Sequence, residues 1–147
     1  MAQIDHATLK RWLEDHESAI ATLFEQAQRE AGGHYAKMTA TARRRQAEID
    51  GRELIADLLQ GGVDRVVVRE TVQAAEARAV ASDDIVRLAT AMDRLFTSYI
   101  EAQLAGQPEM AQELVRRSRN LIASFRASVT AARLDGLLER FKKPSAP

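Results

Sequence analysis

The chain has 147 residues and no cysteine. Disulfides, thiolate metal sites and cysteine nucleophiles are therefore excluded. A chain without disulfides fits the reducing cytoplasm, and we expect that location. The N-terminus lacks the basic-then-apolar pattern of a secretion signal. No stretch approaches the roughly 18 uninterrupted apolar residues of a membrane helix, so no membrane partner is expected.

An excess of charge of one sign is also missing. The 21 basic and 21 acidic residues cancel, whereas a protein that binds nucleic acid usually carries a basic surplus or stripe. Basic residues cluster only at Arg43, Arg44 and Arg45. Neighbouring residues on a helix point about 100° apart, so these three do not form one face. We expect a solvated surface there, with an anionic partner patch as the minor alternative, and no nucleic-acid partner.

Motifs for catalysis, phosphate binding and metal binding are absent. There is no Gly-x-Ser-x-Gly elbow and no Glu-x-x-His pair, and Gly32–Gly33 and Gly61–Gly62 lack the context of phosphate loops. No histidine follows His34, although a globin haem needs a proximal histidine in the second half of the domain. We therefore expect a protein that is not an enzyme and holds no metal or cofactor.

Apolar residues at helical spacing are what the chain has in abundance. Five segments carry the pattern, over residues 5–31, 36–60, 63–81, 82–104 and 108–141. The Val66-Val67-Val68 run has strand propensity, but no second strand-like run exists to pair with it. The sequence thus predicts an all-α domain over residues 4–141, with about five helices. Residues 142–147 are expected to be a disordered tail or a truncated linker.

Several local features of these helices can be predicted. Asp5 or Thr8 is expected to cap the first helix, which then runs unbroken to the Gly32–Gly33 pair. Gly51 is expected to kink or break the second helix, since glycine costs about 1 kcal/mol there relative to alanine. Ser82 should cap the fourth helix, with Asp83 and Asp84 favouring the positive end of its dipole. Pro108 suits the first turn of the last helix.

The segment 108–141 is the most informative part of the chain. Its apolar residues are Met110, Ala111, Leu114, Val115, Leu121, Ile122, Phe125, Val129, Ala132, Leu137 and Phe141. One amphipathic helix of this length exceeds what a domain of this size needs to close its core. Such a helix usually pairs with a partner or carries a signal to something attached.

Three residues are candidates for ligand binding. His16 lies near the centre of the first helix's apolar stripe, where it could ligate haem or sense pH. The alternatives are a partly buried histidine with one hydrogen-bond partner and a histidine at a helix-pairing interface. His34 and Tyr35 follow a glycine pair and could line a pocket mouth. Alternatively they are loop and helix-entry residues, with the ring of Tyr35 on the edge of the core.

Several stretches together carry a resemblance to a known family. They are the opening helix with Trp12-Leu13, the phrase Ala81-Ser82-Asp83-Asp84-Ile85-Val86-Arg87-Leu88, the stripe to Tyr99-Ile100 and the extended last helix. Together they resemble the haem-free N-terminal sensor domain of RsbR-type stressosome co-antagonists, which act in stress-response signalling. The resemblance implies a globin-like fold, a homodimer and a last helix that leads to a downstream STAS domain. The dimer or partner interface that it implies contains Trp12, Ile20, Leu121, Phe125 and Val129.

The expected function is a signalling or dimerisation module that relays a stimulus through its last helix to a partner or downstream domain. Two alternatives stay open. One is a helical sensor that binds haem or a small apolar ligand. The other is a structural helical scaffold.

Overall fold

The computed structural model describes residues 4–77 and 81–142, and this part of the chain contains only helices and their connections. The elements are α1 (His6–Asp15), α2 (Glu17–Ala31), the 3-10 turn η1 (Gly33–Lys37), α3 (Ala40–Gln60), α4 (Arg65–Ala77), α5 (Ser82–Gln103) and α6 (Pro108–Lys142). The all-α prediction and the long last helix are confirmed. In these residues no helix is both long and apolar enough to cross a membrane. The predicted tail began at residue 142, but Lys142 still belongs to α6, and residues 143–147 lie outside the described residues.

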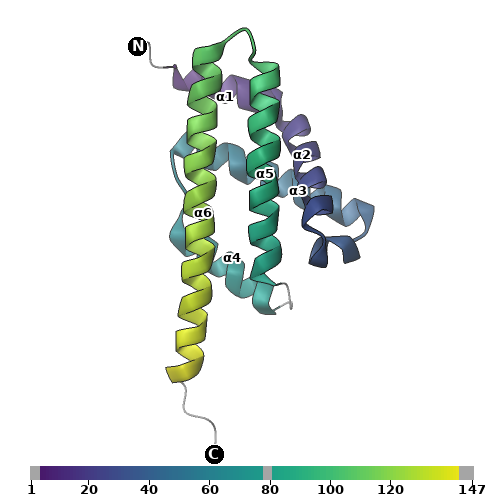
Figure 1. The fold of residues 1–147 in the computed structure, drawn as a ribbon, viewed down its shortest axis with the longest axis vertical. Coiled ribbons are helices and arrows are strands. Elements are labelled where there is room, and N and C mark those ends of the chain that lie inside the picture. The colour runs from purple at the N-terminus through teal and green to yellow at the C-terminus, as the bar shows by residue number, and fades with distance from the viewer. Residues whose placement is uncertain (1–3, 78–80, 143–147) are drawn as a thin grey trace, which may run out of the picture.

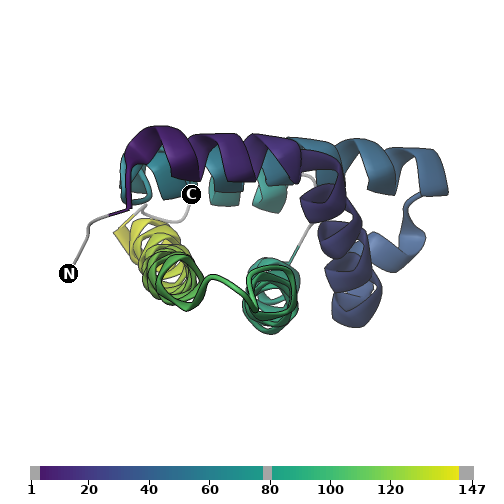
Figure 2. The same cartoon turned by 90° about the horizontal axis from the view of Figure 1, so that it is seen from above.

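The helices form two layers (Figures 1 and 2). The first layer is the antiparallel pair of α5 and α6, and α1, α3 and α4 cross behind it. α2 closes one side by packing on both α3 and α5. The last turns of α6 project beyond the start of α5 and beyond α4 (Figure 1). One end of the longest helix therefore stands clear of the rest of the fold.

The first predicted helix is in fact two helices, so the prediction that it runs unbroken to the Gly32–Gly33 pair was wrong. His16 adopts φ −105° and ψ 11° between α1 and α2. Its ring Nδ1 donates a hydrogen bond of 2.7 Å to the carbonyl oxygen of Trp12, and this local bond competes with the helical pattern. The cap at the other end is Asp5, whose carboxylate accepts a hydrogen bond from the backbone N–H of Ala7 at 3.3 Å.

The expected kink at Gly51 is also wrong, because α3 runs without a break from Ala40 to Gln60. Gly51 is buried against α2. A Cβ built on it would lie 3.6 Å from the backbone nitrogen of Ala21, which is an ordinary contact distance. Packing against α2 keeps the helix straight where the local propensity of glycine would weaken it.

The start of α5 differs in one detail from the prediction. Its N-cap is Ala81, and no side chain makes a capping hydrogen bond, so the capping role expected of Ser82 was wrong. Asp83 and Asp84 lie in the first turn, as predicted. Pro108 opens α6, as predicted.

The buried apolar residues form two clusters. The main core joins α1, α2, α3, α5 and α6. A smaller cluster contains Val68, Val72, Ala75, Ile85 and Val129. Within the valine run of α4, Val68 points into this second cluster while Val66 and Val67 stay exposed. α4 is therefore held mainly by α5 and α6, and it stands apart from the main core.

Candidate ligand pocket

A partly open cavity of about 430 Å³ lies between the two clusters and is lined by α3, α4, α5 and α6, with η1 at one edge. The main core contributes Leu54, Leu88, Met92 and Leu121, and the second cluster contributes Val68, Ala75 and Ile85. Ligand pockets in proteins fall in the range of roughly 300–1,000 Å³. The volume is thus sufficient for a small organic molecule.

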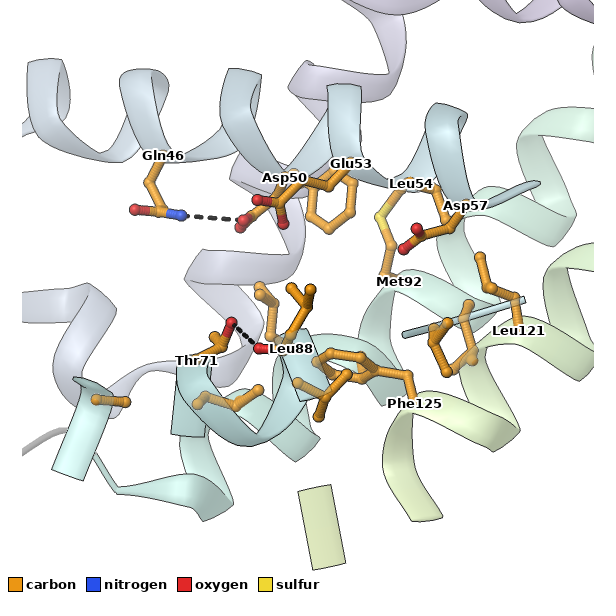
Figure 3. A pocket seen from close by; sticks show the side chains of 18 of the residues that line it. Gln46, Asp50, Glu53, Leu54, Asp57, Thr71, Leu88, Met92, Leu121 and Phe125 are labelled. Carbon is orange, nitrogen blue, oxygen red and sulfur yellow. Dashed lines mark hydrogen bonds between the residues drawn. The ribbon is translucent and has the colours of Figure 1, made fainter. Parts of the chain in front are cut away.

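One side of this pocket is apolar. Leu88 and Met92 of α5 face it together with Leu121 and Phe125 of α6. Figure 3 shows Leu88 and Phe125 across the gap from α3. Phe24 and Tyr35 add two more aromatic rings to the lining. This side can cover the hydrocarbon part of a ligand.

The opposite side is acidic. Asp50, Glu53 and Asp57 line the pocket from α3, and spacings of three and four residues place them on one helical face. Figure 3 shows these side chains projecting from α3 toward the gap. Within the described residues none of the three forms an ion pair. Asp64 follows at the turn into α4, and none of the described residues that line the pocket is a lysine or an arginine.

Burial raises the pKa of Asp50 to about 7. The Gln46 amide, which donates to Asp50 Oδ1 at 2.9 Å, opposes that rise, and the neighbouring charge of Glu53 adds to it. Burial also raises the pKa of Asp57, helped by the charges of Glu53 and Asp64. Among the described residues of the pocket this wall has no counter-charge, so its potential is negative and favours a proton or another cation.

His34 and Tyr35 both line the pocket, and their rings meet edge-on at 5.6 Å. Tyr35 is buried. Burial raises the pKa of its phenol above the usual range, and the charges of Asp50 and Asp84 add to this effect. The phenol is therefore a neutral hydrogen-bonding group at the pocket edge.

A small network fixes η1 at that edge. The backbone N–H of His34 donates to Oδ2 of Asp84 at 3.1 Å, and Asp84 pairs with Arg87. Arg87 Nε in turn donates to the carbonyl oxygen of Ala31 at 3.2 Å. Gly33 has φ +56°, and a Cβ there would lie 2.7 Å from Cγ of Asp84. Only glycine fits this position without a shift.

His16 does not join this site. It lies at the opposite end of α2 from His34, and the fifteen residues of that helix span about 22 Å. Its ring stacks on Trp12 at a centroid distance of 4.1 Å and meets Tyr99 edge-on at 5.8 Å. A haem held between His16 and His34 is therefore excluded by distance. His16 is a half-buried residue at a helix junction.

The residues expected at a dimer interface are largely internal. Ile20, Leu121 and Val129 are buried within a single chain. Trp12 and Phe125 are half-buried against the core clusters. In this fold the first three have no free surface for a partner, because the core of the same chain covers them. The large exposed apolar residues of α6 are Leu134, Leu137, Leu138 and Phe141.

Sequence reasoning missed the acidic wall, although it had a signal in the spacing of Asp50, Glu53 and Asp57 on α3. It also missed that two arginines stabilise the fold through contacts within the chain. Arg43 donates to the carbonyl oxygen of Met38 at 2.7 Å. Arg44 pairs with Glu25 at 2.6 Å and with its helical neighbour Glu48. Arg43 and Arg44 thus serve the fold.

Comparison of the chain with known protein families, with characterised proteins and with solved structures finds no match. The fold and its pocket are therefore the basis of the functional argument.

Proposed function

We propose that this protein is a sensor module without catalytic activity, in which a small ligand occupies the pocket and α6 carries the response. The observation that supports this is that α6 both lines the pocket and extends beyond the domain. Leu121, Ile122 and Phe125 line the pocket, and the same helix continues to Lys142. A rigid helix that touches a ligand and also reaches beyond the domain can transmit a small displacement.

α4 provides a second connection between the pocket and the end of α6. Val68, Thr71 and Ala75 face the pocket from α4. The same helix joins α6 through the pair Arg69–Asp135 at 3.1 Å and the pair Arg140–Glu76 at 3.8 Å. These pairs are exposed and contribute little stability, so packing of Val129 in the second cluster supplies most of the attachment.

A ligand in the cavity would bridge the two clusters. A ligand in contact with both α3 and α4 would then hold α4 more firmly in place, and α4 would restrain the far half of α6. A ligand shifts such an equilibrium only by the difference between its affinities for the two states. The proposal therefore requires that the ligand contact α4 or α6 as well as α3, and residues of all three helices line the pocket.

The partner that we propose for α6 is a second copy of the chain. Leu134, Leu138 and Phe141 follow one another at spacings of four and three residues, and Leu137 lies beside them. This spacing gives one stripe of a helix. At about 100° per residue the stripe lies opposite Val129 and Ala132, which pack on the domain. Dimerisation would bring two such stripes together. A downstream signalling protein could then bind the paired helices in a way that depends on their alignment.

A small molecule is favoured over haem as the ligand. Haem carries two propionate groups, and the four carboxylates of the lining would repel them. A haem in the pocket would also have His34 as its one lining histidine.

The pocket is tested with Nile red, a neutral apolar dye that fluoresces when it leaves water. We expect binding to the wild type and a loss of at least about tenfold in affinity for Ala89→Leu, whose side chain grows into the cavity. Ala56→Leu is the matched control, since Ala56 lies on the exposed side of α3 outside the pocket. Equal binding by both variants, or no binding by the wild type, would contradict the proposal.

A further inference from the structure

We infer that the ligand of this pocket is an organic cation, a hydrophobic amine or quaternary ammonium whose positive group faces Asp50, Glu53 and Asp57 while its hydrocarbon part contacts α5 and α6. This inference rests on the proposed function and deepens it, because it names the chemical class of the ligand.

The charge of the lining is the first argument. Asp50, Glu53, Asp57 and Asp64 bring four carboxylates to the pocket, and lysine and arginine are absent from the lining as far as the structure describes the chain, although the whole chain is neutral. Like charges along one wall repel one another, and burial also desolvates Asp50 and Asp57, whereas Glu53 and Asp64 are exposed. A bound cation relieves both costs, whereas an anion increases them.

The spacing of the carboxylates argues for an organic cation over a metal ion. Asp50 and Asp57 are seven residues apart on α3, which corresponds to a rise of about 10 Å. Ligands of one calcium or magnesium ion must all lie within roughly 2.0–2.6 Å of it. The three carboxylates of α3 are too widely spread to share one ion. These carboxylates suit an organic ammonium group, whose charge is spread over a larger volume than that of a metal ion or can move along the wall.

The rest of the lining fits the remainder of such a molecule. Phe24, Tyr35 and Phe125 are three of the seven aromatic residues of the chain. Aromatic faces attract ammonium groups, and the attraction is stronger where water is excluded. Leu88 and Met92 offer the surface on which a hydrocarbon chain would be buried.

The test uses three probes of the same length: octylammonium, 1-octanol and octanoate. Each is titrated into the wild-type protein at pH 8 by displacement of Nile red and by calorimetry. We expect octylammonium to bind at least about tenfold more tightly than 1-octanol, since a charge-assisted contact adds to the shared burial of the alkyl chain. Octanoate should bind more weakly than the alcohol.

Two double variants locate the effect. Glu53→Gln with Asp57→Asn should reduce the advantage of octylammonium to about twofold and leave 1-octanol binding unchanged. Asp15→Asn with Glu101→Gln removes two exposed carboxylates outside the pocket and should retain the full advantage. Far-UV circular dichroism checks that each variant keeps its helices.

The outcomes separate this inference from the proposed function. If 1-octanol binds the wild type as tightly as octylammonium, or if the pocket variant keeps the advantage, the cationic ligand class is overturned while an apolar sensor pocket stands. If neither Nile red nor any of the three probes binds, the proposed function fails as well.

Discussion

The backbone N–H of His34 donates a hydrogen bond to Oδ2 of Asp84 at 3.1 Å, which joins positions fifty residues apart. This bond ties η1 to the first turn of α5. Asp84 is buried, and its pairing with Arg87 leaves it well compensated. This edge of the pocket is therefore a fixed corner, where η1 and the start of α5 are held together. α4 is held more loosely.

Gly33→Ala tests this corner. The added Cβ would collide with the Asp84 carboxylate at a backbone φ of +56°, so we expect the free energy of unfolding to fall by about 2 kcal/mol or more. Urea unfolding followed by circular dichroism measures the change. Gly106→Ala is the control, because nothing lies within 4 Å of a Cβ there, and it should change stability little. Equal effects of the two substitutions would show that Gly33 is not packed on Asp84.

Gly51→Ala should stabilise the protein. Its Cβ would meet Ala21 and Ile20 at ordinary contact distances, and alanine is favoured over glycine within a helix by about 0.5–1 kcal/mol. The substitution Gly61→Ala should have the opposite effect, because Gly61 ends α3 with φ +90°. Thermal and urea unfolding of both variants check the two signs. A destabilised Gly51→Ala would indicate that α2 and α3 pack more closely than described.

Asp50 should make stability depend on pH. Its pKa rises from 3.8 to about 7 on folding, through burial and the charge of Glu53, and the ionised group also lies near the phenol of Tyr35. The folded state thus binds the proton more tightly than the unfolded state. The resulting cost grows as pH rises from about 4 to 7 and is fully present above that range.

Asp50→Asn should consequently stabilise the protein at pH 8 by about 1–4 kcal/mol and have progressively less effect as pH falls toward 4. Urea unfolding across this range measures the difference from the wild type. Asp15→Asn, an exposed change outside the pocket, should show no such trend. A benefit of Asp50→Asn that increases toward acid pH would contradict this account of the acidic wall.

The exposed stripe of α6 should be needed for dimerisation. We expect the wild type to be a dimer by light scattering and Leu134→Asp with Leu138→Asp to be a folded monomer. Arg119→Glu, on an exposed part of α6 away from the stripe, should remain a dimer. Phe125→Asp should instead destabilise the fold, since Phe125 packs on the second cluster. A monomeric wild type would remove the dimer from the proposal.

The periodicity of apolar residues was sufficient to predict the all-α fold and its long last helix, because helices bury one face. It failed at His16 and Gly51 for opposite reasons. At His16 a side-chain hydrogen bond interrupts a good pattern, and at Gly51 contact with α2 preserves a helix across a poor residue. Both outcomes depend on contacts that the spacing of apolar residues in the sequence does not reveal.

The candidate site was less accessible to sequence reasoning. The position of His34 and Tyr35 after a glycine pair suggested a pocket mouth. Asp50, Glu53 and Asp57, by contrast, have the spacing of an ordinary solvated helix face. They become a pocket wall only because α4, which follows the turn at Gly61, packs on α6 and lines the same cavity.

Binding of a ligand in the pocket should alter the exposed end of α6. Amide hydrogen exchange with and without saturating Nile red tests it most directly, with α1 as the internal reference. We predict that the dye slows exchange in α4 and in residues 129–142 of α6 by about tenfold and leaves α1 unchanged. Protection confined to the pocket-lining residues, with residues 134–142 exchanging as fast as before, would contradict the claim.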